Sequence, residues 1–118
     1  MELVAFLGND KENWGQVTAL LKREQWDKVI LVVNKQAEGF PISGNVEIVK
    51  TDSEQPIMEM KASLLEKLKK KLSGEFEVSL SLASGNGKEH MALIGALLHI
   101  PVGIRLVAFT KNGVEHLT

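Results

Sequence analysis

The stretch FEVSLSLASGNGKEHM, from Phe76 to Met91, decides the fold. Apolar and polar residues alternate over Phe76–Leu82, which predicts a β-strand. A loop with two glycines follows, and the strongly apolar segment Glu89–His99 predicts a helix. A strand that runs through such a loop into a helix can bind an anion, because the first N–H groups of the helix point toward negative charge. The stretch therefore predicts an α/β protein with a phosphate or nucleotide ligand.

The loop residues carry the chemistry of an anion site. Ser84 offers a hydroxyl, Gly85 and Gly87 let the backbone approach a ligand closely, and Lys88 adds a positive charge. The spacing is not that of a P-loop, because Glu89 stands where Ser or Thr must follow the lysine. It also lacks the third glycine of a dinucleotide-binding fingerprint. A plain strand-to-helix turn with a solvated lysine remains the alternative interpretation.

The composition limits the classes of function. The 118 residues suffice for a single domain spanning residues 1–118, with 44% hydrophobic and 25% charged residues as in soluble globular proteins. A net charge of −1 provides no basic field for direct binding to duplex DNA. The absence of cysteine excludes disulfides, thiolate catalysis and cysteine metal sites. We see no signal peptide or membrane-length apolar run, and expect a cytoplasmic protein without a membrane partner.

Short apolar runs predict the other strands. They lie at Leu3–Leu7, Val29–Val33, Val46–Val49 and Ile104–Phe109, and Val29–Val33 is β-branched throughout apart from Leu31. The sequence Lys111-Asn112-Gly113 is a hairpin signal, so Val114–Leu117 is expected to return as an antiparallel edge strand.

Two further helices are predicted between these strands. The first follows Gly8 and is expected to be capped by Asn9 or Asp10, because Glu12 stands three residues after Asn9 as in a capping box. The second is entered over Thr51–Gln55, with Pro56 tolerated in its first turn. Its predicted buried stripe consists of Ile57, Met60, Leu64, Leu68 and Leu72.

The resulting order β-α-β-β-α-β-α-β-β predicts a Rossmann-like three-layer α/β sandwich. Its sheet is mostly parallel and closes with a C-terminal antiparallel β-hairpin. Ligands of such sheets lie at the carboxyl ends of the strands, near the point where the strand order reverses. We therefore expect the loop Gly8–Asp10 to meet the loop Ser84–Lys88 at this edge.

The segment Met91–Leu98 contains no polar side chain, although a helix on one face of a sheet normally keeps a polar side. Either other elements of the chain cover it completely, or part of it packs against a second subunit. For a domain this small we favour a homodimer.

The element order and one motif together resemble the CRISPR-associated Rossmann fold, or CARF, domain. That family commonly carries a loop like Thr-Gly-Gly-Thr-Lys, followed by a Met and an Ala-rich helix. Here the matching residues are Ser84-Gly85-Asn86-Gly87-Lys88 and then Met91-Ala92. Asn86-Gly87 stands where the family has paired glycines, which leaves the set of backbone donors open. Family members usually continue into a helix-turn-helix or nuclease domain, so this sequence is expected to be a stand-alone sensor, a ring nuclease or the N-terminal part of a longer regulator.

The resemblance implies ligand sensing in CRISPR-linked antiviral defence. CARF domains dimerise and bind cyclic oligoadenylates across the two-fold axis with the loops after strands one and four. Some of them, called ring nucleases, also cleave the ring without a metal, by attack of a ligand 2′-hydroxyl on the neighbouring phosphate. It therefore implies a cyclic oligoadenylate or related nucleotide as partner, and neither a metal nor a cofactor.

Carried onto this sequence, the resemblance makes Lys88 and Asn9 the candidate catalytic residues. Lys88 would contact a phosphate and stabilise the developing charge, and Asn9 would orient the ring or its hydroxyl. Asp10 would repel a phosphate, so we expect it to cap its helix instead. The full candidate ligand-binding set is Gly8, Asn9, Ser84, Gly85, Asn86, Gly87 and Lys88.

Two other classes of function stay open. A conventional hydrolase has little support, because His90 and His99 would lie about 180° apart on one helix and His116 has no partner at triad or metal spacing. A protein-interaction or regulatory α/β module without a nucleotide ligand is supported by the apolar helix and by the absence of a complete catalytic set.

Overall fold

The computed structural model describes residues 1–42, 44–72, 74 and 76–118. In chain order the elements are β1 (Glu2–Leu7), the 3-10 turn η1 (Lys11–Asn13), α1 (Trp14–Arg23), β2 (Lys28–Asn34), β3 (Val46–Thr51), α2 (Ile57–Lys71), β4 (Glu77–Ser81), α3 (Gly87–Leu98), β5 (Gly103–Thr110) and β6 (Gly113–His116). This is the predicted order of strands and α-helices, with one additional 3-10 turn before α1.

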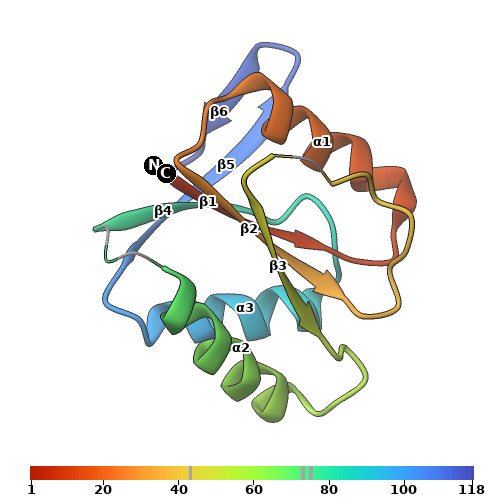
Figure 1. Cartoon of the computed structure of the whole chain (residues 1–118), viewed down its shortest axis with the longest axis vertical. Coiled ribbons are helices and arrows are strands. Elements are labelled where there is room, and N and C mark those ends of the chain that lie inside the picture. The colour runs from red at the N-terminus through yellow and green to blue at the C-terminus, as the bar shows by residue number, and fades with distance from the viewer. Residues whose placement is uncertain (43, 73, 75) are drawn as a thin grey trace.

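The strands form one sheet in the order β3-β2-β1-β4-β5-β6 (Figure 1). Strands β1 to β5 pair in parallel, and β6 closes the sheet as the antiparallel partner of β5. The chain moves outward from β1 to β3 and then returns to the other side of β1 with β4, so the strand order reverses between β1 and β4. The predicted Rossmann-like fold with a C-terminal hairpin is confirmed.

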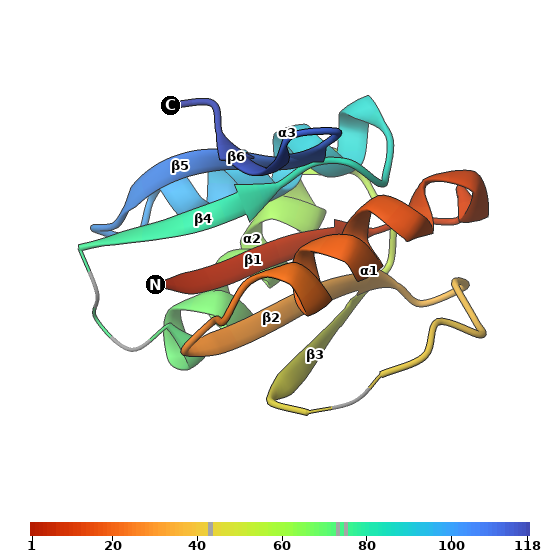
Figure 2. The ribbon, with the colours of Figure 1, turned by 90° about the horizontal axis from the view of Figure 1, so that it is seen from above.

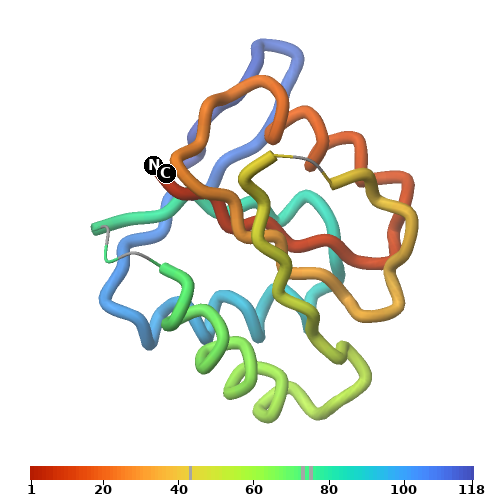
Figure 3. Tube along the Cα trace, in the orientation of Figure 1, coloured from red at the N-terminus to blue at the C-terminus, as the bar shows by residue number. Residues whose placement is uncertain are grey.

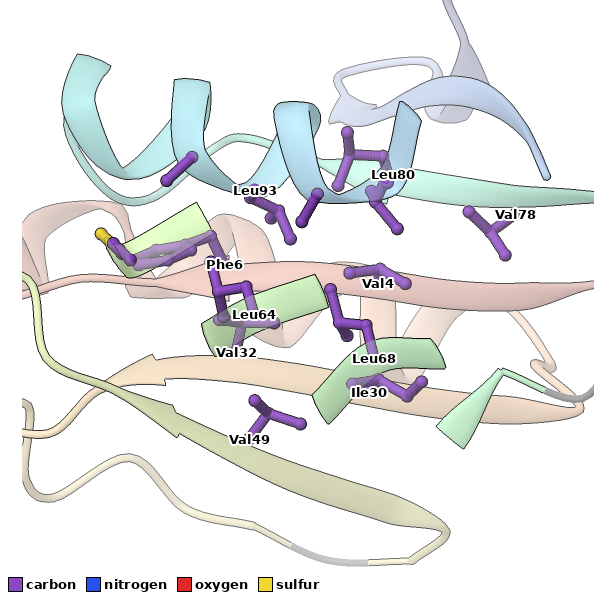
Figure 4. Packing of buried hydrophobic residues seen from close by; sticks show 14 residues of the cluster. Val4, Phe6, Ile30, Val32, Val49, Leu64, Leu68, Val78, Leu80 and Leu93 are labelled. Atoms are coloured by element: carbon purple, nitrogen blue, oxygen red, sulfur yellow. The ribbon is translucent and has the colours of Figure 1, made fainter. Parts of the chain in front are cut away.

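Helices cover both faces of the sheet, with α1 on one face and α2 and α3 on the other (Figure 2). Alternate residues of the central strands therefore belong to two separate cores. Phe6 points into the core under α2 and α3, where Leu64 and Leu93 pack against the sheet (Figure 4). Leu7 belongs to the core under α1, together with Leu20. Each such fully buried side chain stabilises the fold by about 1.5–3 kcal/mol.

Strand β4 has no solvent-exposed polar face, despite its alternating sequence. Ser79 and Ser81 are both 0% exposed, because β4 lies between β1 and β5 and both of its faces are covered. Phe76 was predicted to begin this strand but lies just before it and is 95% exposed.

Helix α3 is covered by its own chain on one side only. Met91 and Leu98 are 62% and 71% exposed, whereas the buried side chains of the apolar segment are Ala92, Leu93, Ala96 and Leu97. Complete coverage by other elements of the chain, the first of the two explanations for this segment, is therefore wrong.

The helix starts depart from the predictions by a few residues. Thr51 belongs to β3, and α2 begins at Ile57, which is 36% exposed and not part of the buried stripe. Helix α3 begins at Gly87 rather than Glu89.

Within the described residues, no helix combines the length and the apolar character that crossing a membrane requires.

Candidate functional site

The loops after β1 and β4 meet at the carboxyl ends of these neighbouring strands (Figure 3). The N–H of Gly8 donates a hydrogen bond of 2.9 Å to the hydroxyl oxygen of Ser84, and this bond is buried. The predicted convergence of the two loops is therefore confirmed, and it follows from the reversal of strand order between β1 and β4.

Two glycines allow this close approach. A Cβ atom on Gly8 would lie 2.8 Å from the Cα of Gly85, so the two backbones touch where they pass. Gly85 has a φ of +107°, and a Cβ there would lie 2.8 Å from the ring of Phe6 and 2.9 Å from the imidazole of His90. A side chain at Gly85 would thus meet both backbone strain and a steric clash.

The carboxylate of Asp10 lies at the centre of the junction. Its Oδ1 accepts hydrogen bonds from the Ser84 hydroxyl at 2.7 Å and from the Gly85 N–H at 3.0 Å. Its Oδ2 accepts a bond of 2.7 Å from the side-chain amide of Asn13. The prediction that Asn9 or Asp10 caps the first helix was wrong, because neither η1 nor α1 receives a side-chain cap and α1 begins only at Trp14.

The pKa of Asp10 lies below its ordinary value. Partial burial acts to raise this pKa, but the hydrogen bonds from Asn13, Ser84 and Gly85 together outweigh the effect of burial. Asp10 is therefore a carboxylate at neutral pH. Its oxygen accepts from Ser84 and Gly85, two residues that were predicted to bind a ligand.

A capping box begins α3. The side-chain oxygen of Asn86 accepts from the N–H of Glu89, and the carboxylate of Glu89 accepts from the N–H of Asn86, each at 2.9 Å. The N–H of Asn86 is therefore already bonded to a side chain of the protein and is not free to donate to a ligand. Among the described hydrogen bonds, none involves the N–H of Gly87 or Lys88, so these two donors of the first turn remain open to an anion.

The loop after β3 forms a third side of the site. The Lys88 ammonium donates a hydrogen bond of 2.8 Å to the backbone oxygen of Ser53. The Ser53 hydroxyl donates to the carboxylate of Glu89, a side chain that is only 2% exposed. Beside it, Asp52 pairs with Lys35 at 3.3 Å. Sequence analysis did not place this loop at the site.

The predicted site residues differ in their accessibility. Gly8 and Ser84 are buried, and the Ser84 hydroxyl both accepts and donates within the protein. Asn9 is exposed, and among the described hydrogen bonds none involves its side chain. Lys88 is half-buried and is held against the loop after β3. The exposed residues here are thus Asn9 and, at the start of α3, Asn86 and Gly87.

The ring of His90 lies under the same loop. Its Nε2 is 2.8 Å from the backbone oxygen of Ser84, and its ring meets Phe6 edge-on with centroids 6.2 Å apart. This contact supports the shape of the loop. His116 lies elsewhere, with its Nε2 3.0 Å from the hydroxyl of the buried Ser79.

Sequence reasoning missed several side chains of the site, to different degrees. The Asn86-x-x-Glu89 spacing is a capping-box signal that is visible in the sequence. The contacts of Asp10 and Ser53 have no such signal, because their partners lie 74 and 36 residues away in the chain.

The described residues contain no group of three or more His, Asp or Glu side chains that could hold a metal ion.

Comparison with known proteins gives a similarity of structure but none of sequence. No model of a protein family matches this chain, and no curated protein sequence matches it. Among solved structures, Enterococcus italicus Csm6 bound to cyclic hexa-2′-fluoro-hexa-dAMP matches with a TM-score of 0.62 and 18% sequence identity. The match covers 93% of this chain and 33% of Csm6, so this chain spans about a third of that protein's length. At this identity the similarity establishes a shared fold.

Proposed function

We propose that this chain is a CARF-like domain that binds a cyclic oligoadenylate or a related nucleotide at the loops after β1 and β4. The observation that carries the proposal is the buried junction of Gly8 and Ser84 at the switch point of the sheet, next to the open first turn of α3. The structural similarity to a protein bound to a cyclic hexanucleotide analogue supports the choice of ligand class.

The ligand phosphate would lie at the start of α3. The N–H groups of Gly87 and Lys88 point toward this position, and the positive end of the helix dipole favours a negative charge there. The Lys88 ammonium would leave the backbone oxygen of Ser53 and pair with the phosphate, because a charged partner forms a stronger hydrogen bond than a neutral carbonyl group. The exposed Asn9 would contact the ring from the opposite loop.

A homodimer belongs to the same proposal. Met91 and Leu98 lie seven residues apart on α3 and therefore on one side of the helix, where they are 62% and 71% exposed. A second copy packing on this side would bury both side chains. The dimer would then carry two nucleotide sites, one at the first turn of each copy of α3.

Whether the ring is cleaved distinguishes two forms of this function. In a ring nuclease, Lys88 would stabilise the charge that develops on the phosphate while Asn9 positions the attacking 2′-hydroxyl. In a sensor, the same residues would bind the ring without turnover, and the protein would pass the signal to an effector in CRISPR-linked antiviral defence.

The test is to incubate the protein with cyclic tri-, tetra- and hexa-adenylate in EDTA. Binding is followed by calorimetry and linear products by chromatography. We expect at least one ring to bind, and Lys88→Ala to lower its affinity by about tenfold or more, since an ion-pair contact is lost. Lys70→Ala, which removes an exposed lysine from the last turn of α2, serves as the control and should retain the wild-type affinity.

The results separate the alternatives. Linear products from the wild type that disappear in Lys88→Ala and Asn9→Ala would identify a metal-independent ring nuclease. Binding without products would identify a sensor. Failure to bind any of the three rings would contradict the proposed function and favour a protein-interaction or regulatory module.

A further inference from the structure

Asp10 places a negative charge inside the loop that should receive an anion. Three donors converge on its carboxylate: the Ser84 hydroxyl, the Gly85 N–H and the side-chain amide of Asn13, at 2.7, 3.0 and 2.7 Å. A hydroxyl and a glycine N–H from a strand-to-helix loop are the groups that bind phosphate oxygens in many nucleotide sites. In this structure both the hydroxyl and the N–H donate to the Asp10 carboxylate instead.

We infer that Asp10 acts as an internal competitor, an autoinhibitory anion that occupies the inner donors of the β4–α3 loop until a phosphate displaces it. This inference rests on the proposed function, because it concerns the regulation of the same site. The loop donors thus exist in two states, one bound to Asp10 and one bound to the ligand. The apparent affinity of the site is then set partly by how tightly the protein binds its own carboxylate.

The surroundings of Asp10 allow this exchange. Asp10 is half-buried and lies on the loop between β1 and η1, so rotation of its carboxylate toward solvent leaves the core unchanged. Ser84 cannot move in the same way, because it is 0% exposed and also accepts the Gly8 N–H. The donors therefore stay in place while the anion that they bind can change.

Electrostatic repulsion indicates how the charge of Asp10 changes the affinity for an anion. A phosphate at the first turn of α3 would lie close to the Asp10 carboxylate, and two negative charges a few ångströms apart repel each other even near solvent. Removing the charge of Asp10 should therefore strengthen the binding of an anion.

The variant Asp10→Asn tests this inference. Its side-chain oxygen can still accept from Ser84 and Gly85, and the amide of Asn13 can turn over to accept from the new NH₂ group. We expect it to bind the preferred cyclic oligoadenylate about tenfold more tightly than the wild type, because one repulsive charge and one competing anion are removed. Glu12→Gln removes the same charge from the exposed turn η1 and should change the affinity less than about twofold.

A second ligand separates this inference from the proposed function. If no ring binds to either protein, tripolyphosphate is used as a simple anion, and Asp10→Asn should still bind it more tightly than the wild type. An equal or lower affinity of Asp10→Asn for the ring, or for tripolyphosphate where no ring binds, would overturn the inference.

A measurement on the wild-type protein does not depend on how the variant folds. Displacement of Asp10 predicts that a saturating ligand shifts the NMR resonances of the Asp10 carboxyl carbon and the Gly85 amide. Unchanged resonances at saturation would show that Asp10 stays on its donors, and would also overturn the inference.

Discussion

The Ser84 hydroxyl donates a hydrogen bond of 2.7 Å to the Asp10 carboxylate across a sequence separation of 74 residues. The bond joins the loops after the first and fourth strands, which are neighbours in the sheet although half of the chain lies between them. Asp10 therefore has a structural role in addition to the regulatory role inferred above, and the two roles predict different results for different substitutions.

Asp10→Ala should lower the free energy of unfolding by about 2–4 kcal/mol. The substitution leaves Ser84 and Gly85 without their acceptor, and hydrogen bonds to charged groups contribute about 1.5–3 kcal/mol each. Asp10→Asn keeps an acceptor and should cost only about 1 kcal/mol. Urea unfolding at pH 7 measures both values. A loss of under 0.5 kcal/mol for Asp10→Ala, the size expected for the exposed Glu12→Gln, would contradict this role.

The contribution of Asp10 to stability should depend on pH. Because its pKa in the folded protein lies below the unfolded value of about 3.9, the contribution is complete above about pH 4 and is lost as the pH falls through the folded pKa. The stability of the wild type should therefore fall toward that of Asp10→Asn below pH 4. Urea unfolding of both proteins between pH 2 and 7 measures the difference. A difference that stays constant over this range would show that Asp10 does not titrate with a lowered pKa.

Substitution of Gly85 at the junction of the two loops should lower the stability far more than substitution of a glycine elsewhere. Gly85→Ala should cost about 3 kcal/mol or more, because it combines a φ of +107° with a Cβ that lies 2.8 Å from the ring of Phe6. Gly15→Ala in α1 is the matched control, since a Cβ there has no heavy atom within 4 Å. It should raise the stability by about 0.5–1 kcal/mol. Thermal unfolding compares the two, and similar values would contradict the tight approach of the loops.

The Ser53 hydroxyl should stabilise the start of α3 from the neighbouring loop. It donates to the carboxylate of Glu89, which is 2% exposed and needs its hydrogen-bond partners. Ser53→Ala should therefore lower the free energy of unfolding by about 1–3 kcal/mol. Ser63→Ala on α2, whose side chain has no described hydrogen bond, should change it by less than about 0.5 kcal/mol. Hydrogen exchange at the first turn of α3 should accelerate in Ser53→Ala, and unchanged exchange would contradict this contact.

Leu98→Lys should separate the proposed dimer. It places a charge on the exposed side of α3, where Leu98 is 71% exposed, and a lysine at a helix C-terminus does not disfavour the helix itself. Sedimentation analysis should show dimers for the wild type and monomers for the variant. Leu117→Lys replaces a leucine that is 62% exposed after β6 and should remain dimeric. A monomeric wild type would contradict the homodimer.

Local sequence patterns were enough to predict the fold and the meeting of the loops after the first and fourth strands. The apolar run Val29–Val33, the helical stripe around Leu64 and the glycines at 85 and 87 each act within about fifteen residues of chain. Their order implies parallel strands with right-handed crossovers, and from this the meeting of two loops at one edge of the sheet follows. These predictions succeeded because periodicity and turn chemistry are local properties.

The tertiary structure alone decided which groups occupy the site. The sequence gives no indication that Asp10 leaves its own helix to accept from Ser84, or that Ser53 reaches Glu89, because these partners become neighbours only after β1 is placed beside β4 and α2 beside α3. The exposure of Phe76 and the burial of Ser79 also depend on where the sheet is covered rather than on the pattern of the strand. The sequence by itself determined that a Rossmann-like sheet would bring two glycine-containing loops together. Packing determined that a carboxylate of the chain would lie between them, because a hydrogen bond forms wherever the folded backbone brings donor and acceptor within reach.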